Sequence, residues 1–180
     1  FRLDPHNTQI LYYANDDTLY RTTTASAVTT TSWTKMTGLA AAIGTTHDIT
    51  AMATTRGTYS PATASLFIGA SDVSGSITSA KLFRLDDPAS AAPGTGPVDI
   101  TSGSFPASSF ISSIAVNPRN DDTVIVTFSN YGVTGNVWWT GNANSATPTW
   151  TNVEGTLLAP SFRSSAIAIT SAGVEYFVGT

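Results

Sequence analysis

Hydrophobic and polar residues alternate in short stretches along the chain. The clearest stretch is residues 111–130, ISSIAVNPRNDDTVIVTFSN, where an alternating run meets a polar turn and a second run rich in Val, Ile and Phe follows. Alternation with a period of two predicts half-buried β-strands, and a polar, Pro-containing turn between them predicts a hairpin. Residues 1–15, FRLDPHNTQILYYAN, repeat the pattern with Asp-Pro in place of Asn-Pro. We expect the Asp4 and Asn117 side chains to cap equivalent turns.

This hairpin belongs to a longer repeat. Equivalent first strands are centred on Phe1, Met52, Ile114 and Ile167. Second strands follow as QILYYAN, ASLFIGAS, DTVIVTFSN and VEYFVGT, third strands as TLYRTTT, KLFRLDD and NVWWTGN, and fourth strands as SWTKMTG, PVDITSG and TWTNVEG. The sequence therefore predicts a unit of four short strands that occurs three times and begins a fourth time. The approximate bounds of these units are 1–48, 49–110, 111–163 and 164–180.

The composition supports an all-β fold with almost no helix. Charged residues make up 11% of the chain, against roughly 25% in an average soluble domain. Thr, Ser and Asn supply the polarity instead, and Thr suits a pleated, half-buried surface while Asn suits turns. Small residues in the second strands, such as Gly69 and Ala70, are expected where neighbouring sheets crowd together.

Repeated four-stranded units of this length are typical of a β-propeller. A closed propeller has about four to eight blades, so we expect the chain to be a fragment of a larger ring. A β-sandwich of similar strands is the alternative, although a sandwich does not require a repeat of fixed order.

Charge and residue types exclude several classes of function. The net charge is −4 and the basic residues are scattered singly, which argues against a nucleic-acid partner. The chain has no cysteine, so disulfides and thiolate metal sites are excluded. It has no apolar run long enough for a membrane-spanning helix, so membrane insertion is not expected.

The stretches IAVNPRNDDTVIVTFSN, LYRTTT and PTWTNV resemble the Asp-box, or BNR-repeat, β-propeller superfamily, and the resemblance covers the whole chain as repeat architecture. In that superfamily a Ser-x-Asp-x-Gly-x-Thr-Trp turn joins the third and fourth strands, and its Trp packs between blades. Trp33 and Trp150 match the Trp. The Asp position is occupied by Val28 and Ser145, and the Gly position by Thr30 and Thr147.

The resemblance implies a secreted or cell-surface protein similar to sortilin-type and xyloglucanase-type propellers, and the lack of Asn-x-Ser/Thr sequons favours a bacterial one. Some relatives are sialidases, which hold a substrate carboxylate with arginines. Arg21 and Arg84, however, recur at one position of the third strand, where Trp139 stands in the third unit. A residue placed by the repeat is expected to have a structural role.

No catalytic constellation emerges. Asp16-Asp17, Asp86-Asp87 and Asp121-Asp122 stand at different places in the unit, and we interpret them as turn residues. His6 and His47 have no second His at a zinc-binding spacing. We therefore predict no catalytic residues, no metal and no cofactor.

Trp138, Trp139 and Tyr131 are the candidate ligand-binding residues. Neighbouring residues on a strand face opposite ways, so one of the two tryptophans is free to join Tyr131 in a platform for a sugar ring. The alternative is that both tryptophans pack between sheets.

The sequence as a whole favours a non-catalytic binding or scaffold propeller. Its expected partners are a protein or polysaccharide at the cell surface and the remaining blades of the same or a larger protein. The alternative is part of a glycoside hydrolase of the xyloglucanase type, whose paired carboxylates are not identifiable among these residues.

Overall fold

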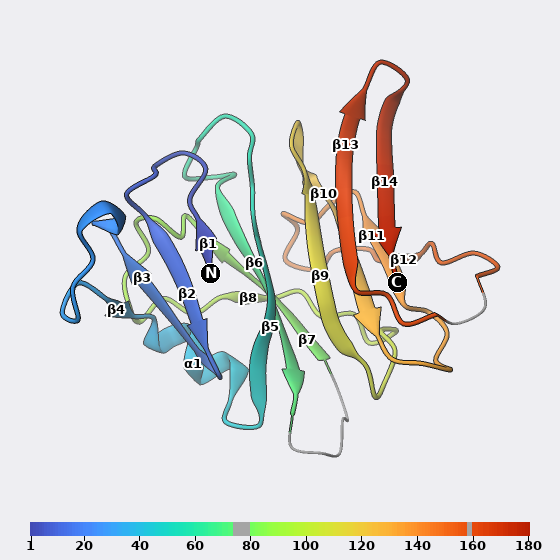
Figure 1. Cartoon of the computed structure of the whole chain (residues 1–180), viewed down its shortest axis with the longest axis horizontal. Helices are drawn as coiled ribbons and strands as arrows, with labels where there is room; N and C mark the ends of the chain where they lie inside the picture. The colour runs from blue at the N-terminus through green and yellow to red at the C-terminus, as the bar shows by residue number, and fades with distance from the viewer. Residues whose placement is uncertain (74–79, 158–159) are drawn as a thin grey trace.

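The computed structural model describes residues 1–73, 80–157 and 160–180. The prediction of an all-β protein is confirmed: the strands form three four-stranded antiparallel sheets and a two-stranded hairpin. Within each sheet, neighbouring strands follow one another along the chain. Figure 1 shows the first sheet in blue on the left, the second in teal and green in the middle, and the third, in yellow and orange, on the right with the red hairpin in front of it.

The strand bounds follow the repeat. The first sheet contains β1 (Arg2–Leu3), β2 (Leu11–Asn15), β3 (Thr18–Thr22) and β4 (Thr34–Lys35). The second contains β5 (His47–Thr54), β6 (Ser65–Asp72), β7 (Ala80–Asp86) and β8 (Val98–Asp99). The third contains β9 (Phe110–Asn117), β10 (Asn120–Ser129), β11 (Val137–Thr140) and β12 (Thr151–Asn152). The terminal hairpin contains β13 (Ser164–Thr170) and β14 (Gly173–Gly179).

The expected fourth strand of the first unit is cut short by a helix. Strand β4 has two residues, and the helix α1 (Thr37–Ile43) follows a 3₁₀ turn (Ala25–Ala27) and β4 along the chain. Leu39 and Ile43, four positions apart, share one face of the helix and are both buried in the core. The helix begins close to a loop of the second sheet. A Cβ added to Gly38 would lie only 2.3 Å from the Thr95 carbonyl oxygen of that loop.

The core lies between the sheets, and alternation along β6 divides its side chains between two neighbouring sheets. All eight residues of β6 are buried. Leu66 and Ile68 join the apolar cluster shared with the first sheet, while Phe67 joins the cluster shared with the third sheet. A strand with both faces covered in this way is stabilised only when sheets lie on both sides of it.

The crowding predicted at Gly69 is confirmed. A Cβ on this residue would lie 2.5 Å from Cγ2 of Ile111, on strand β9 of the third sheet. Strand β9 therefore approaches β6 at a distance that only glycine permits.

Arg21 and Arg84 have the structural role that their recurrence in the repeat predicts, and they exercise it by connecting neighbouring sheets. Nη1 of Arg21 donates to the carbonyl oxygens of Pro88 (2.7 Å) and Ala91 (2.8 Å), in the second sheet's loop between its third and fourth strands. Nη1 of Arg84 donates to the carbonyl oxygens of Ala143 (2.7 Å) and Ser145 (2.9 Å), in the corresponding loop of the third sheet. Each arginine thus fixes a loop of the next sheet, and the structural interpretation is confirmed.

Arg84 is charge-compensated within its own sheet. Its Nε lies 2.6 Å from Oδ1 of Asp86, and its side chain is almost fully buried. Since a buried guanidinium without a partner is costly, this ion pair is part of what allows Arg84 to cross the junction between the sheets.

The two Pro-containing turns are capped as predicted. Oδ1 of Asp4 accepts from the backbone N–H of His6 at 2.8 Å, and Oδ1 of Asn117 accepts from that of Arg119 at 2.9 Å. Asp4 is buried and also accepts from the Tyr12 hydroxyl at 2.9 Å. Burial, with the Asp4 carboxylate as a second cause, raises the pKa of Tyr12 far above its usual value.

We predict that Gly69→Ala destabilises the protein by about 1–3 kcal/mol, because the added methyl group overpacks the junction with Ile111. The free energy of unfolding, from urea denaturation, measures the loss. Gly103→Ala is the matched control, since a Cβ there meets nothing within 4 Å. Equal denaturation midpoints for the two variants would contradict the close approach of β6 and β9.

We predict that Tyr12→Phe costs about 1–2 kcal/mol at neutral pH, through the lost hydrogen bond to buried Asp4. The pKa of Tyr12 is raised in the folded state, so its stabilising effect is present below the unfolded tyrosine pKa of about 10 and declines at higher pH. The stability difference between wild type and Tyr12→Phe should therefore shrink as the pH rises above that value.

Denaturation at several pH values measures this difference. Tyr131→Phe, at a side chain that is 75% exposed, is the control and should show none. A gap between wild type and Tyr12→Phe that stays constant into the alkaline range would contradict the assignment.

Candidate functional site

Trp138 lies in the core between the second and third sheets. Its side chain is 8% exposed, and its ring centroid lies 5.5 Å from that of Phe105 in an edge-to-face contact. Its indole Nε1 donates to the carbonyl oxygen of Gly135 at 2.5 Å. Both the ring and the polar atom of Trp138 are thus used within the fold.

Trp139 faces the opposite way, toward the terminal hairpin. Its Nε1 donates to the Tyr176 hydroxyl at 3.3 Å. Trp139 also lines a largely apolar hollow of about 440 Å³ between the third sheet and the hairpin. The other residues that line this hollow are Ile125, Val137, Val153, Tyr176 and Val178.

The register explains this contact. Trp139 pairs with Ile125, as Arg84 pairs with Phe67 and Arg21 with Tyr12. Trp139 therefore stands at the repeat position from which the arginines reach the next sheet, and it reaches the terminal hairpin instead.

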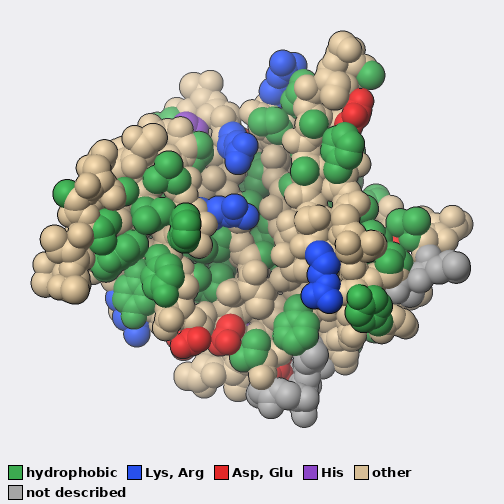
Figure 2. Space-filling model, viewed as in Figure 1, with side chains coloured by type: hydrophobic (Ala, Val, Ile, Leu, Met, Phe, Trp, Pro, Cys, Tyr) green, Lys and Arg blue, Asp and Glu red, His purple; other side chains and the backbone are tan. Residues whose placement is uncertain are grey.

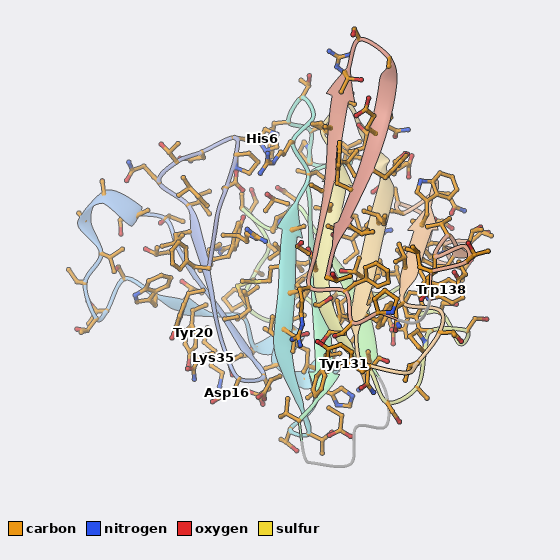
Figure 3. All side chains as sticks on the ribbon, turned by 45° about the vertical axis from the view of Figure 1, so that its right-hand side comes forward. His6, Asp16, Tyr20, Lys35, Tyr131 and Trp138 are labelled. Carbon is orange, nitrogen blue, oxygen red and sulfur yellow. The ribbon has the colours of Figure 1, made fainter. Side chains whose placement is uncertain are left out.

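Tyr131 is not part of the same surface. It lies between β10 and β11, is 75% exposed, and does not line the hollow that contains Trp139. Figure 3 labels Tyr131 and Trp138 at separate places on the molecule. The structure therefore places the three candidates in three environments: a sheet junction, a contact with the hairpin, and solvent.

An aromatic surface that the sequence did not predict covers the outer face of the first sheet. Ring centroids are 6.4 Å apart for Tyr13 and Tyr20, and 5.9 Å apart for Tyr13 and Trp33. With Asn15 and Thr30 these residues line a hollow of about 430 Å³. We call Tyr13, Tyr20 and Trp33 the first-sheet aromatic face.

The two repeated tryptophans have different surroundings. Trp150 packs against Phe105, with 5.3 Å between ring centroids, and its Nε1 donates to the Ile100 carbonyl oxygen beside β8 of the second sheet at 3.0 Å. The expected role between neighbouring sheets is confirmed for Trp150. For Trp33 it stays a prediction, because no sheet of the described residues lies beside that face of the first sheet.

The first strands of all three sheets and of the hairpin surround a central hollow. Its larger part is about 480 Å³ and is lined by residues of β1, β5, β9 and β13. An adjoining part of about 320 Å³ shares Phe1 and Arg2 with it. Strand β9 packs beside both β5 and β13, which brings these strands together although they are far apart in the sequence.

The charged residues that line the central hollow are Arg2 and Arg56. Nε of Arg2 donates to the Met52 carbonyl oxygen at 2.5 Å, which directs the guanidinium across from β1 to β5. Arg56 is exposed just after β5. Figure 2 shows basic side chains near the middle of this face, between the first sheet and the hairpin.

These arginines make the central hollow positive in a chain whose net charge is −4. Thr54 and Ser165 add hydroxyl groups, and Ala53, Ala115 and Ala166 add an apolar lining. Sequence reasoning missed the site because Arg2 and Arg56 match no motif. They come together only because β1 contacts β5.

The remaining titratable candidates are used in turns and local contacts. Asp16 and Asp87 have positive φ angles of 52° and 42°, in agreement with their interpretation as turn residues. His6 has its Nδ1 3.6 Å from Asp4 and its Nε2 2.6 Å from the Gly57 carbonyl oxygen.

Within residues 1–73, 80–157 and 160–180, no three His, Cys, Asp or Glu side chains gather as a metal site. A search of the same residues finds no helix with the length and hydropathy to cross a membrane.

Comparisons of the chain with protein-family models, with curated proteins and with solved structures gave no significant match.

Proposed function

We propose that the chain is a β-propeller segment that acts as a non-catalytic binding module of a secreted or cell-surface protein. Its central hollow is the binding site, and the ligand is a carboxylate-bearing polysaccharide. The observation that carries this proposal is the pair Arg2 and Arg56, the charged side chains of a hollow lined by all four first strands.

The arrangement of the sheets supports the propeller. Three four-stranded meanders and a hairpin follow one another in chain order, and the first strand of each lines the same hollow. Blades of a propeller surround a central channel in this way. Trp150 between the second and third sheets agrees with the Asp-box resemblance, in which the repeated Trp packs between blades.

The chemistry of the hollow supports an anionic sugar polymer. A guanidinium binds a carboxylate through two parallel hydrogen bonds, and Nη1 and Nη2 of Arg2 have no acceptor among the described residues. The hydroxyls of Thr54 and Ser165 suit sugar hydroxyl groups. A hollow of about 480 Å³ has the volume of a typical small-ligand site.

The two parts of the central hollow and the two aromatic hollows offer arginine, hydroxyl and aromatic groups for binding. Glycoside hydrolysis requires two carboxylates about 5 to 10 Å apart across the substrate. No Asp or Glu lines these hollows among the described residues. The lining residues therefore support binding rather than the glycoside hydrolase alternative.

We predict that polygalacturonate binds the protein and that a neutral glucan of similar length does not. Arg2→Gln and Arg56→Gln should each weaken polygalacturonate binding about tenfold or more, because each removes a charge-assisted contact. Isothermal titration calorimetry measures the dissociation constants, and added salt should weaken binding by the wild type.

Arg119→Gln is the matched control, since Arg119 is exposed in the turn between β9 and β10 and does not line the hollow. It should bind polygalacturonate like the wild type. Equal affinity for the neutral and acidic polymers, or equal losses for all three arginine variants, would contradict the proposed site.

A further inference from the structure

The first-sheet aromatic face corresponds to faces that are buried elsewhere in the molecule. Tyr13 pairs with Tyr20, Ile68 with Phe83, and Val126 with Trp138 at the equivalent position of each sheet. The pair in the second sheet packs against the first sheet, and the pair in the third sheet packs against the second. In the first sheet the same position is exposed: Tyr13 is 42% exposed.

The opposite end of the molecule carries the other half of such a junction. Tyr176 and Val178 face the third sheet, so Phe177 between them faces away from it, and Phe177 is 51% exposed. Phe177 pairs with Ala166, as Phe67 pairs with Ala53 and Ile125 with Ala115. Phe67 and Ile125 are the residues with which the second and third sheets meet their following neighbours.

We propose that the first-sheet aromatic face of one copy docks on the outer face of the terminal hairpin of a second copy, the face that carries Phe177 and Glu175. This head-to-tail contact repeats the junctions that already join successive layers within the chain. It differs from the ligand site because it uses the two ends of the molecule and not the central hollow.

Charge on the two faces is complementary. Lys35 pairs with Tyr20 and therefore shares the outer face of the first sheet, as the two neighbouring labels in Figure 3 show. Glu175 lies two residues before Phe177 and faces the same way. Opposite charges favour the head-to-tail orientation over contacts between two identical faces.

The size of the contact favours a closed pair of copies. Tyr13 and Phe177 are 42% and 51% exposed, and Tyr20 and Trp33 are already half-buried, so these four rings bury at one junction less than half of the roughly 600–1,000 Å² that four fully exposed rings would bury at 150–250 Å² each. A stable interface buries roughly 1,200–2,000 Å², so one junction of this size gives only weak association and two junctions are needed for a dimer at high concentration. A head-to-tail contact supplies two junctions when it closes into a ring. Closure of this kind rests on the proposed propeller arrangement.

Sedimentation velocity from micromolar to millimolar concentration tests the proposal. We expect a concentration-dependent dimer. Trp33→Lys and Phe177→Lys should each weaken association about tenfold or more, because each places a charge in an apolar contact. Tyr131→Lys is the control. Tyr131 is exposed, but it lies between β10 and β11 and belongs to neither docking face, so this variant should associate like the wild type.

A mixture of the two variants separates head-to-tail docking from all other contacts. The Trp33→Lys copy retains an intact hairpin and the Phe177→Lys copy retains an intact aromatic face. Together they can form one unaltered junction, so their mixture should associate more strongly than either variant alone. Because the chain has no cysteine, single-cysteine labels on each variant report this pairing by energy transfer.

Several results would overturn the proposal. A wild type that stays monomeric from micromolar to millimolar concentration would do so. Binding of a neutral oligosaccharide at Trp33 in that monomer would not restore the proposal. Loss of association on changing Trp33 but not Phe177 would instead indicate contact between two aromatic faces.

Circular dichroism checks that the variants are folded, and Tyr13→Lys replaces Trp33→Lys if the latter is unfolded. Arg2→Gln and Arg56→Gln should leave association unchanged, so failure of ligand binding and failure of docking are distinguishable.

Discussion

The packing of one sheet against the next is the interaction on which the rest of this structure depends. Strand β6 has no solvent-facing side: every residue in it is buried, with alternate side chains in two different apolar clusters. Such a strand cannot be stable in an isolated sheet, since the burial of its apolar surface drives the assembly. The close approach at Gly69 and the low charge content are consequences of the same requirement.

Polar contacts give each junction its alignment. Arg21 and Arg84 cross from a third strand to carbonyl oxygens in the following sheet's loop, and each satisfies two of these oxygens at once. The hairpin has no such loop among the described residues, and Trp139 occupies the arginine position beside it. The residue type at this position thus corresponds to what the neighbouring layer offers, carbonyl oxygens in two cases and the Tyr176 hydroxyl in the third.

The sequence predicts well whatever depends on the repeat. The strand order, the capping by Asp4 and Asn117, and the structural role of the arginines all follow from local patterns that recur. The helix α1 could not be predicted in this way. Its Gly38 lies against a loop more than fifty residues later, and no periodic pattern records such a contact.

At the candidate site, too, local features follow from the sequence pattern, whereas features that depend on the assembled sheets do not. Trp138 and Trp139 were expected on opposite faces, and they are. Which face has a neighbouring sheet is a property of the assembled molecule, and Trp33 and Trp150 have different surroundings for that reason alone. Arg2 and Arg56 are separated by a whole unit of the sequence and meet only where β1 and β5 come together.

Residues at one repeat position therefore have different surroundings, according to whether their sheet lies between two others or at an end of the series of three sheets and the hairpin. The aromatic residues at this position pack in a junction between two sheets but are exposed at either end, where no sheet of the described residues covers them. The first strands differ from the others because they line the central hollow in every layer, inside the series and at its ends alike. The proposed ligand would therefore contact the first strand of every layer, whereas the proposed docking uses only the two end faces. The two proposed sites share no side chain, and Arg2 is held in its position beside β5 by its own hydrogen bond to the Met52 carbonyl oxygen.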